Sequence, residues 1–171
     1  MRLSLFIHTP NLSSEREIMK RTAIAHPNIA LIKYWGKRDI PLNLPSVPSL
    51  SLTLSKFYTE TTVTWGAKRD RFVLNGLERD AEAKKVFQFL DIIDPKRPPC
   101  VVKSDNNFPT AAGLASSASA FAALALAGTA AAEKKYSIQE LSVLARRGSG
   151  SACRSLWGGW VEWAKGNKSD G

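Results

Sequence analysis

The alternation of apolar and polar positions predicts β-strands through much of the chain. Residues 49–54 alternate strictly between a hydroxyl-bearing side chain and leucine, as a half-buried strand does. Residues 22–32 are mostly apolar with Asn28 set inside them, which predicts a strand that leads into a turn. Asn75-Gly76 gives the strongest hairpin signal in the sequence. The other predicted strands cover residues 59–65, 71–74, 101–104 and 157–163.

Three segments have helical spacing or composition instead. Residues 78–93 repeat apolar side chains at helical intervals and end where a proline follows. Residues 118–132 are rich in alanine, which predicts a buried helix that lies close to a sheet. Residues 137–147 open on a capping box formed by Ser137 and Glu140. Strands and helices together predict an α+β fold in which helices back an antiparallel or mixed sheet.

The chain is interpreted as a short amino-terminal extension followed by one domain. Residues 1–7 hold only a short apolar run, and a polar stretch, residues 11–16, follows it. We therefore expect residues 1–18 to be a mis-called start or a disordered extension. Residues 19–171 then form a single domain, because a chain of this size buries roughly 70% of its unfolded surface without disulfides. Three prolines between positions 41 and 48 predict an extended loop inside that domain.

The net charge of the chain limits the classes of partner that it is suited to bind. Lys and Arg outnumber Asp and Glu by 24 to 15, a net charge of +9 that suits nucleic acid, an anionic membrane or a small polyanion. There is no basic run with interleaved aromatic residues, and the most apolar run, residues 111–132, is too rich in alanine to span a bilayer. A small polyanion therefore remains as the expected ligand. The alternative is that the positive charge belongs to an ordinary solvated surface. Two isolated cysteines suit a cytoplasmic protein.

The strongest chemical signal is the segment Asn-Asn-Phe-Pro-Thr-Ala-Ala-Gly-Leu-Ala-Ser-Ser-Ala-Ser, residues 106–119. A loop of small residues runs directly into the predicted alanine-rich helix. Unpaired N–H groups in the first turn of a helix bind phosphate, and small side chains let the backbone approach the ligand. The segment is not a Walker loop, because no Gly-Lys-Ser/Thr follows. A plain loop with an N-capped helix is the alternative.

Two further clusters are suited to anions. Residues 147–155, Arg-Gly-Ser-Gly-Ser-Ala-Cys-Arg-Ser, alternate glycine and serine and end beside Arg154, which can bind a carboxylate or phosphate bidentately. Residues 28–37, Asn-Ile-Ala-Leu-Ile-Lys-Tyr-Trp-Gly-Lys, place two lysines and two aromatic rings around a glycine turn. Each cluster also has a purely structural interpretation, as a capped helix end and as a solvent-facing turn.

These three segments resemble the diphosphomevalonate decarboxylase family of the GHMP kinase superfamily. The Lys-Tyr-Trp-Gly-Lys and Gly-Ser-Gly-Ser-Ala-x-Arg-Ser motifs are specific to the decarboxylase branch, whereas Gly-Leu-Ala-Ser-Ser is the general phosphate loop of the superfamily. The similarity extends from about Thr22 to the end and is nearest to bacterial members. It implies a GHMP-kinase amino-terminal domain, of the ribosomal protein S5 domain 2-like type, without the carboxy-terminal domain.

The resemblance also implies an activity, its cofactors and its oligomeric state. The family uses ATP and Mg²⁺ to phosphorylate the 3-hydroxyl of mevalonate 5-diphosphate. Loss of that phosphate and of carbon dioxide then gives isopentenyl diphosphate for isoprenoid biosynthesis. Positioning and electrostatic clamping carry most of phosphoryl transfer, which suits loops that bind anions. The family tends to form homodimers.

Site residues are implied by the matched motifs and, for Lys85, by its spacing from Asn75-Gly76. Arg154, which holds the substrate carboxylate, and Lys33, beside the reacting hydroxyl, are the implied catalytic residues. Substrate contacts are implied for Tyr34, Trp35, Gly36, Lys37, Lys85 (with Lys84 as the alternative), Ser149, Gly150, Ser151, Ala152, Cys153 and Arg154. Nucleotide contacts are implied for Pro109, Ala112, Gly113, Leu114, Ala115, Ser116 and Ser117, with Ser117 also a metal ligand.

The sequence departs from the family in its length. Members are close to twice as long, and the aspartate proposed to orient or deprotonate the 3-hydroxyl lies in their second half. No residue here matches it, so we expect the isolated chain to be a truncated, inactive form that binds weakly. Two alternatives stay open: a sister GHMP enzyme (a phosphomevalonate decarboxylase or mevalonate 3-kinase) and a non-catalytic nucleotide-binding fragment. His26 is interpreted as structural.

Overall fold

The computed structural model describes residues 19–109 and 116–169. The amino-terminal extension, residues 1–18, and the central part of the phosphate loop, residues 110–115, lie outside the described residues. The strands are β1 Lys20–Ala25, β2 Asn28–Ile32, β3 Lys37–Asp39, β4 Leu44–Pro45, β5 Ser49–Thr53, β6 Thr59–Trp65, β7 Arg71–Leu74, β8 Leu77–Glu78, β9 Cys100–Asn106 and β10 Trp160–Trp163. The helices are α1 Asp80–Ile93, α2 Ser116–Ala131, α3 Ile138–Gly148 and the 3₁₀ helix η1 Gly150–Leu156.

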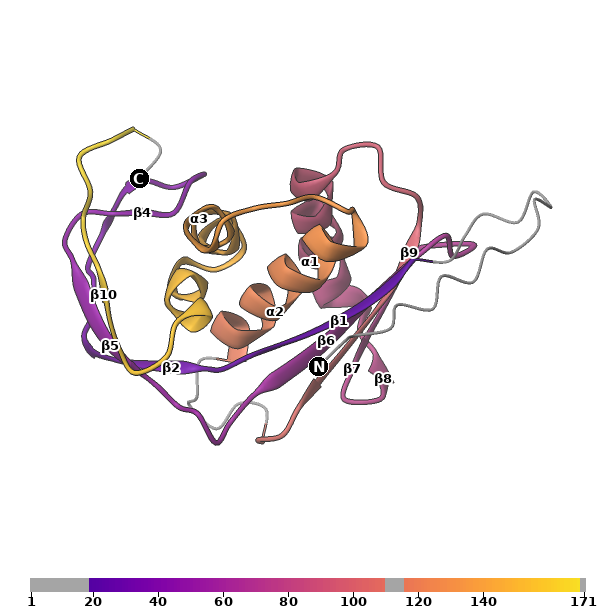
Figure 1. Cartoon of the computed structure of the whole chain (residues 1–171), viewed down its shortest axis with the longest axis horizontal. Coiled ribbons are helices and arrows are strands. Elements are labelled where there is room, and N and C mark those ends of the chain that lie inside the picture. Colours follow the sequence, from indigo (N-terminus) through magenta and orange to yellow (C-terminus); the bar gives the residue numbers. More distant parts are fainter. Residues whose placement is uncertain (1–18, 110–115, 170–171) are drawn as a thin grey trace, which may run out of the picture.

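Helices cover one side of the β-sheets, as Figure 1 shows. The largest sheet has the strand order β1-β6-β9-β7-β8, and a second sheet has the order β10-β5-β2. Strands β7 and β9 pair in parallel, while β1, β6 and β8 pair antiparallel with their neighbours. Helix α1 makes the crossover between β7 and β9 that a parallel pair requires. The predicted α+β fold with a mixed sheet backed by helices is therefore confirmed.

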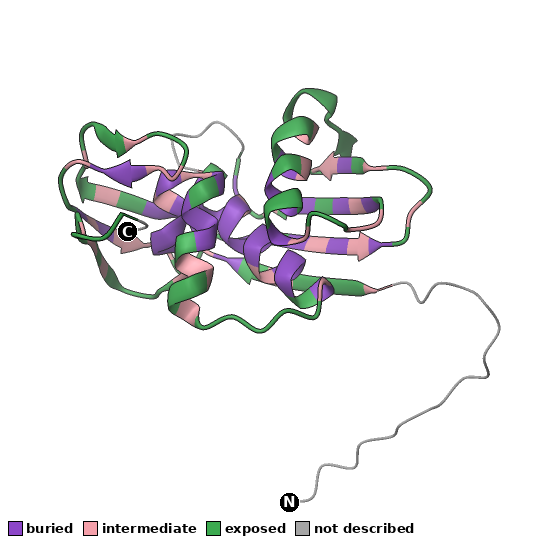
Figure 2. Cartoon of the chain, turned by 90° about the horizontal axis from the view of Figure 1, so that it is seen from above, coloured by how far each residue is buried: buried purple, intermediate pink, exposed green. Residues whose placement is uncertain are grey.

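Helix α2 forms the centre of the core. It packs against β1, β6, α3 and η1, and Figure 2 shows the buried residues gathered along it and on the strands beside it. Small side chains make this possible: Ala118, Ala122 and Ala125 are fully buried. At Gly128 an added Cβ would lie 2.8 Å from Leu90, so the glycine sets how closely α1 and α2 approach.

The predicted strand over residues 22–32 is in fact two strands. Strand β1 ends at Ala25 and β2 begins at Asn28, and they belong to different sheets. Pro27 lies between them. Pro27 has no backbone N–H to donate to a neighbouring strand. Its carbonyl accepts a hydrogen bond from the Leu54 N–H at 2.9 Å. The apolar character of both strands concealed the point at which the chain leaves one sheet for the other.

Strand β5 confirms the predicted strand but buries its serines. Ser49 and Ser51 are 1% and 0% exposed, whereas Leu50 and Leu52 are only half-buried. The face that meets η1 is polar because it receives the Arg154 guanidinium, to which Ser49 offers its oxygen. The usual rule that the apolar face of a strand packs inward is thus reversed at this strand.

The remaining differences are at element ends. Strand β10 is shorter than predicted, β9 is longer, and α2 begins two residues earlier, at Ser116. The predicted turn and extended loop around positions 34–48 pair briefly as β3 and β4.

Helix α3 has the predicted capping box, in which the Ser137 hydroxyl accepts from the Glu140 N–H and the Glu140 carboxylate accepts from the Ser137 N–H. No helix in the described ranges has the length and apolar character needed to cross a membrane.

Gly148→Ala is expected to destabilise the fold by about 1–3 kcal/mol, because an added Cβ would lie 2.1 Å from the buried Phe121 ring. The measurement is urea denaturation followed by circular dichroism. Gly158→Ala is the matched control, since nothing lies within 4 Å of its added Cβ. Equal stability of the two variants would contradict the close packing between α3 and α2.

Candidate functional site

A buried guanidinium lies at the centre of the site. Arg154, on η1, is 3% exposed, and its Nε and Nη2 both donate to Asn28 Oδ1 at 3.1 Å. Its Nη1 donates to Ser49 Oγ at 2.7 Å. These bonds use three of the five N–H groups of the guanidinium. No carboxylate in residues 19–109 or 116–169 forms an ion pair with Arg154. The side chain is a fixed cation with N–H groups left for an anion.

Asn28 holds the arginine on one side and the η1 segment on the other. It is 2% exposed, and its Nδ2 donates to the Ser151 carbonyl at 3.0 Å and to Ser155 Oγ at 2.8 Å. All four capacities of the amide are directed at residues of η1. Asn28 therefore fixes the guanidinium and the serine-rich segment in one arrangement.

Aromatic rings close the same site. Tyr34 packs edge-on against Trp163 with the ring centroids 4.8 Å apart, and the Arg154 guanidinium lies 5.6 Å from the Trp163 ring. An added Cβ at Gly150 would lie 2.6 Å from the Tyr34 hydroxyl, so only glycine allows this approach. Burial lowers the pKa of Arg154 from its usual value, while the Cys153 thiol and the Tyr34 hydroxyl act in the opposite direction. The site is a desolvated positive centre that would bind an anion strongly.

The start of α2 meets this site at one pair of hydroxyl groups. Ser117 Oγ lies 3.3 Å from Ser149 Oγ, which belongs to the residue that ends α3 and precedes η1. Two of the three anion-suited clusters, separated by some thirty residues in the chain, are thus in contact. A ligand at the first turn of α2 and a ligand beside Arg154 would be neighbours.

A cavity of about 450 Å³ lies between α1 and the first turn of α2. Lys85 is on its wall together with Ser116 and Ser117, and the Lys85 ammonium lies 4.9 Å from the centre of the Phe121 ring. The rest of the lining consists of Phe72, Leu74, Ala81, Glu82, Val86, Ser104, Asn106, Ala120 and Phe121. The cavity combines an apolar floor with one cation, one carboxylate, one amide and three hydroxyl groups.

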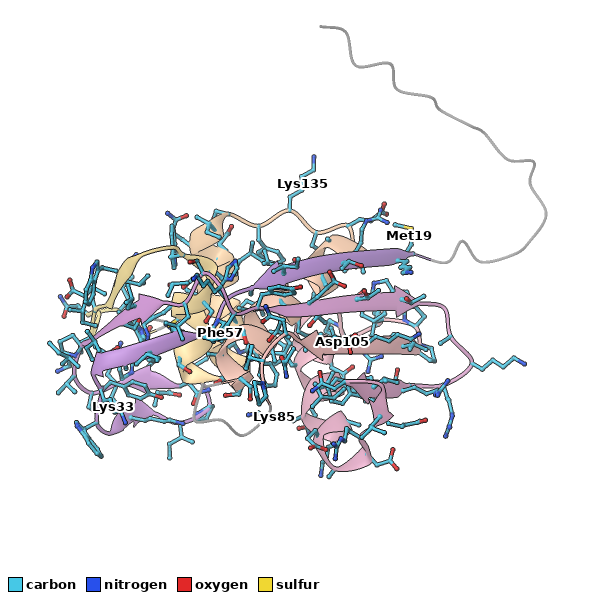
Figure 3. The ribbon with its side chains drawn as sticks, turned by 90° about the horizontal axis from the view of Figure 1, so that it is seen from below. Met19, Lys33, Phe57, Lys85, Asp105 and Lys135 are labelled. Carbon is cyan, nitrogen blue, oxygen red and sulfur yellow. The ribbon has the colours of Figure 1, made fainter. Side chains whose placement is uncertain are left out.

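The lysines and aromatic residues of the third cluster are more dispersed. Lys33 and Trp35 are exposed, Trp35 at 76%, and Figure 3 shows Lys33 far from Lys85. The Lys37 ammonium donates to Asn43 Oδ1 at 2.6 Å. Gly36 has a φ of +72°, which favours glycine, and its carbonyl accepts from the Ser46 N–H at 3.2 Å. Of this cluster, Asn28 accepts two hydrogen bonds from Arg154, and Tyr34 packs against the Trp163 ring that also lies beside the Arg154 guanidinium.

Two predicted substrate residues point into the core. Ala152 is fully buried, and Cys153 is 5% exposed with its thiol donating to the Gly150 carbonyl at 3.1 Å. Burial raises the pKa of the Cys153 thiol to about 12. A thiol of this kind is inert at neutral pH, and both side chains support η1 from beneath.

The phosphate-loop residues are only partly described. Ser116 and Ser117 lie at the start of α2, and Pro109 is exposed at the end of the preceding described segment. Ala112, Gly113, Leu114 and Ala115 lie outside the described residues. Within the part of the chain that is described, no group of three or more His, Cys, Asp or Glu side chains is arranged to hold a metal ion. The Ser117 hydroxyl is an oxygen ligand of the kind that Mg²⁺ accepts beside phosphate oxygens.

Comparison with known proteins decides the family. Residues 25–171 match the model of the diphosphomevalonate decarboxylase-like N-terminal domain. This chain belongs to the diphosphomevalonate decarboxylase family. It is 46% identical to the diphosphomevalonate decarboxylase of Aspergillus fumigatus, in an alignment covering 93% of this chain and 45% of that protein. It is 43% identical to the human diphosphomevalonate decarboxylase, over 94% of this chain and 44% of the relative.

Solved structures of family members have the same fold. The mevalonate diphosphate decarboxylase of Enterococcus faecalis superposes with a TM-score of 0.83 at 49% identity, over 90% of this chain and 50% of that one. A structure described as MDDEF in complex with MVAPP, AMPPCP and magnesium gives a TM-score of 0.82 at 51% identity, over 90% and 49% of the two chains. The chain spans about half the length of the curated relatives it matches.

Three residues of the arginine site were not predicted from the sequence. Asn28 stands inside an apolar run, a pattern that assigns it no role, and the alternation of residues 49–54 predicts a strand but no contact for Ser49. The pattern around Trp163 likewise predicts only a strand. A polar residue inside an apolar run was the available signal for Asn28, since a buried polar group must find a partner. Ser49 and Trp163 gave no comparable signal.

Asn28→Ala is expected to destabilise the chain by about 3 kcal/mol, because the buried Arg154 would lose two of its three acceptor contacts. Ser51→Ala is the control on the same polar sheet face: its hydroxyl makes a 3.4 Å bond to the Val161 carbonyl, and its loss should cost less than about 1 kcal/mol. Chemical denaturation monitored by tryptophan fluorescence measures both. A small effect for Asn28→Ala would show that Arg154 does not depend on it.

Proposed function

We propose that this chain forms the ATP- and substrate-binding half of a diphosphomevalonate decarboxylase. The reaction is the ATP-dependent decarboxylation of mevalonate 5-diphosphate to isopentenyl diphosphate through phosphorylation of the 3-hydroxyl. In this proposal residues 19–171 act as one GHMP-type nucleotide-binding domain. The observation that carries the proposal is the 3.3 Å contact between Ser117 Oγ and Ser149 Oγ. It places the first turn of α2, which is suited to phosphate, next to the Arg154 site.

The nucleotide is assigned to the first turn of α2 and the cavity beside it. Ser116, Ser117 and the backbone N–H groups of this turn would hold the phosphates. The apolar floor around Phe72 and Phe121 suits a base or ribose, and Lys85 would contact a phosphate. Magnesium bound with the nucleotide would neutralise charge on the transferring phosphoryl group, with the Ser117 hydroxyl as one ligand. The relative described as a complex with AMPPCP and magnesium supports this assignment.

Lys85 is thereby also assigned to the nucleotide, beside the contact with the substrate diphosphate that the resemblance implies. It shares a cavity wall with Ser116 and Ser117, whereas the Arg154 site lies around Tyr34 and Trp163. A substrate diphosphate that reaches past Ser149 toward Ser117 would still come close to the same cation. The two anions would then share one positive region, as transfer between them requires.

The substrate carboxylate is assigned to Arg154. A carboxylate accepts two parallel N–H bonds from a guanidinium, and Arg154 has N–H groups beyond those that bind Asn28 and Ser49. Its burial makes the pairing strong, because water does not compete. Tyr34 and Trp163 would exclude water from the same side. A fixed carboxylate beside a transferred phosphate is the arrangement that loss of carbon dioxide needs.

ATP binding tests the nucleotide assignment. Isothermal titration of the chain with ATP and Mg²⁺ should show one site, and Lys85→Ala should weaken it by at least about tenfold, because a cation on the cavity wall is lost. Lys135→Ala is the control, since Lys135 is exposed and lies far from Lys85 in Figure 3. Absence of ATP binding in the unmodified chain would overturn the proposed function.

Discrimination between two diphosphates tests the carboxylate assignment. The unmodified chain should bind mevalonate 5-diphosphate at least about tenfold more tightly than isopentenyl diphosphate, which lacks the carboxylate. Arg154→Gln should remove this ratio, while Arg21→Gln, on the exposed surface of β1, should retain it. Because the ratio is taken within one variant, a partial loss of folded protein does not imitate the effect. Equal affinities in the unmodified chain would exclude Arg154 as the carboxylate site.

A further inference from the structure

The residues just beyond β9 are fastened to the entry of β6. The Asn107 N–H donates to the Tyr58 carbonyl at 3.1 Å, and Asn107 Oδ1 accepts from the Tyr58 N–H at 2.7 Å. Phe108 is 4% exposed and packs edge-on against Phe57 with the ring centroids 5.8 Å apart. Residues 57–59, called here the β6 entry segment, therefore hold the chain on one side of the phosphate loop.

Thr59, at the end of this segment, also reaches the other side of the loop. It is fully buried, and its hydroxyl donates to Asn106 Oδ1 at 2.6 Å. The same oxygen lies 2.6 Å from Ser119 Oγ, in the first turn of α2, and Ser119 is itself fully buried. Either hydroxyl of this pair can be the donor, and Ser119 Oγ also donates to the Ser116 carbonyl at 3.2 Å. One hydroxyl thus joins the last residue of β9 to the start of α2.

We propose that Thr59 is a positioning residue for nucleotide binding. It fixes the direction in which the first turn of α2 presents Ser116 and Ser117. The inference rests on the proposed function, because it takes this turn as the phosphate site. Hydrogen bonds to a phosphate are directional, so a small rotation of the turn weakens several of them together.

A second buried hydroxyl pair shows what is particular to Thr59. Thr61 lies two residues further along β6 on the same face, and its hydroxyl is 2.8 Å from Ser104 Oγ. Thr61 is 1% exposed and Ser104 is 3% exposed. That pair joins β6 to β9, which the strand ladder already joins, and makes no hydrogen bond to α2. Thr61 is therefore a control of the same residue type, strand, face and burial.

Three variants test the proposal with ATP and Mg²⁺ in isothermal titration. Thr59→Val replaces the hydroxyl with a methyl group and should weaken ATP binding about fivefold. Thr59→Ser keeps the hydroxyl and should restore affinity to within about twofold of the unmodified chain. Thr61→Val should lower the melting temperature about as much as Thr59→Val, yet leave ATP affinity within the same twofold limit.

The outcomes separate this inference from the proposed function. Equal ATP affinity for Thr59→Val and Thr61→Val, with ATP binding retained, overturns the role of Thr59 alone. Failure of Thr59→Ser to restore the affinity also overturns it. No ATP binding by the unmodified chain overturns the proposed function and the inference with it.

Amide hydrogen exchange gives a second measurement that needs no ligand. In Thr59→Val, the amides of Asn107 and Ala120 should exchange at least about fivefold faster than in Thr61→Val, because the link between β9 and α2 is lost. This difference would support the link. Equal exchange at both amides in the two variants would show that Thr59 does not hold the two sides together.

Discussion

The structure depends on a buried guanidinium that has to be satisfied. A charged group taken out of water destabilises the fold unless hydrogen-bond acceptors surround it. Arg154 finds these acceptors in Asn28 and Ser49, on two neighbouring strands of the β10-β5-β2 sheet. The serine face of β5 turns inward to meet it, and Asn28 begins β2 where the chain leaves the larger sheet. The need of the Arg154 guanidinium for hydrogen-bond acceptors thereby determines which face of the β10-β5-β2 sheet packs inward.

Close approach of backbones brings the site together. Gly148 and Gly150 stand on either side of Ser149, and neither has room for a Cβ, because Phe121 and the Tyr34 hydroxyl occupy that space. Ser149 is consequently held against the first turn of α2, where Ser117 meets it. The glycines of the Gly-Ser-Gly-Ser segment thus act through packing. The anion-binding capacity of the segment follows from where that packing places its serine and its arginine.

The two regions of the site are held by different means. Around Arg154, side-chain amide and hydroxyl groups on β2 and β5 position a cation. Around the start of α2, buried hydroxyl groups on β6 and α2 position backbone N–H groups. The polar groups around Arg154 are buried, where electrostatic stabilisation of charged ligands is strongest, whereas Ser117 at the start of α2 is exposed. The proposed reaction, phosphoryl transfer followed by loss of carbon dioxide, would require both.

Local pattern by itself determined most of the strands, the α-helices, the capping box at Ser137 and the motifs that identify the family, because these depend on neighbouring residues and on side-chain chemistry. Only the tertiary structure decided which groups meet. Ser49 and Arg154 are 105 positions apart, and the inward face of β5 depends on that contact. Lys85 joined Ser116 and Ser117 because α1 crosses beside α2. Burial and partner choice are set by contacts distant in the chain, which periodicity does not contain.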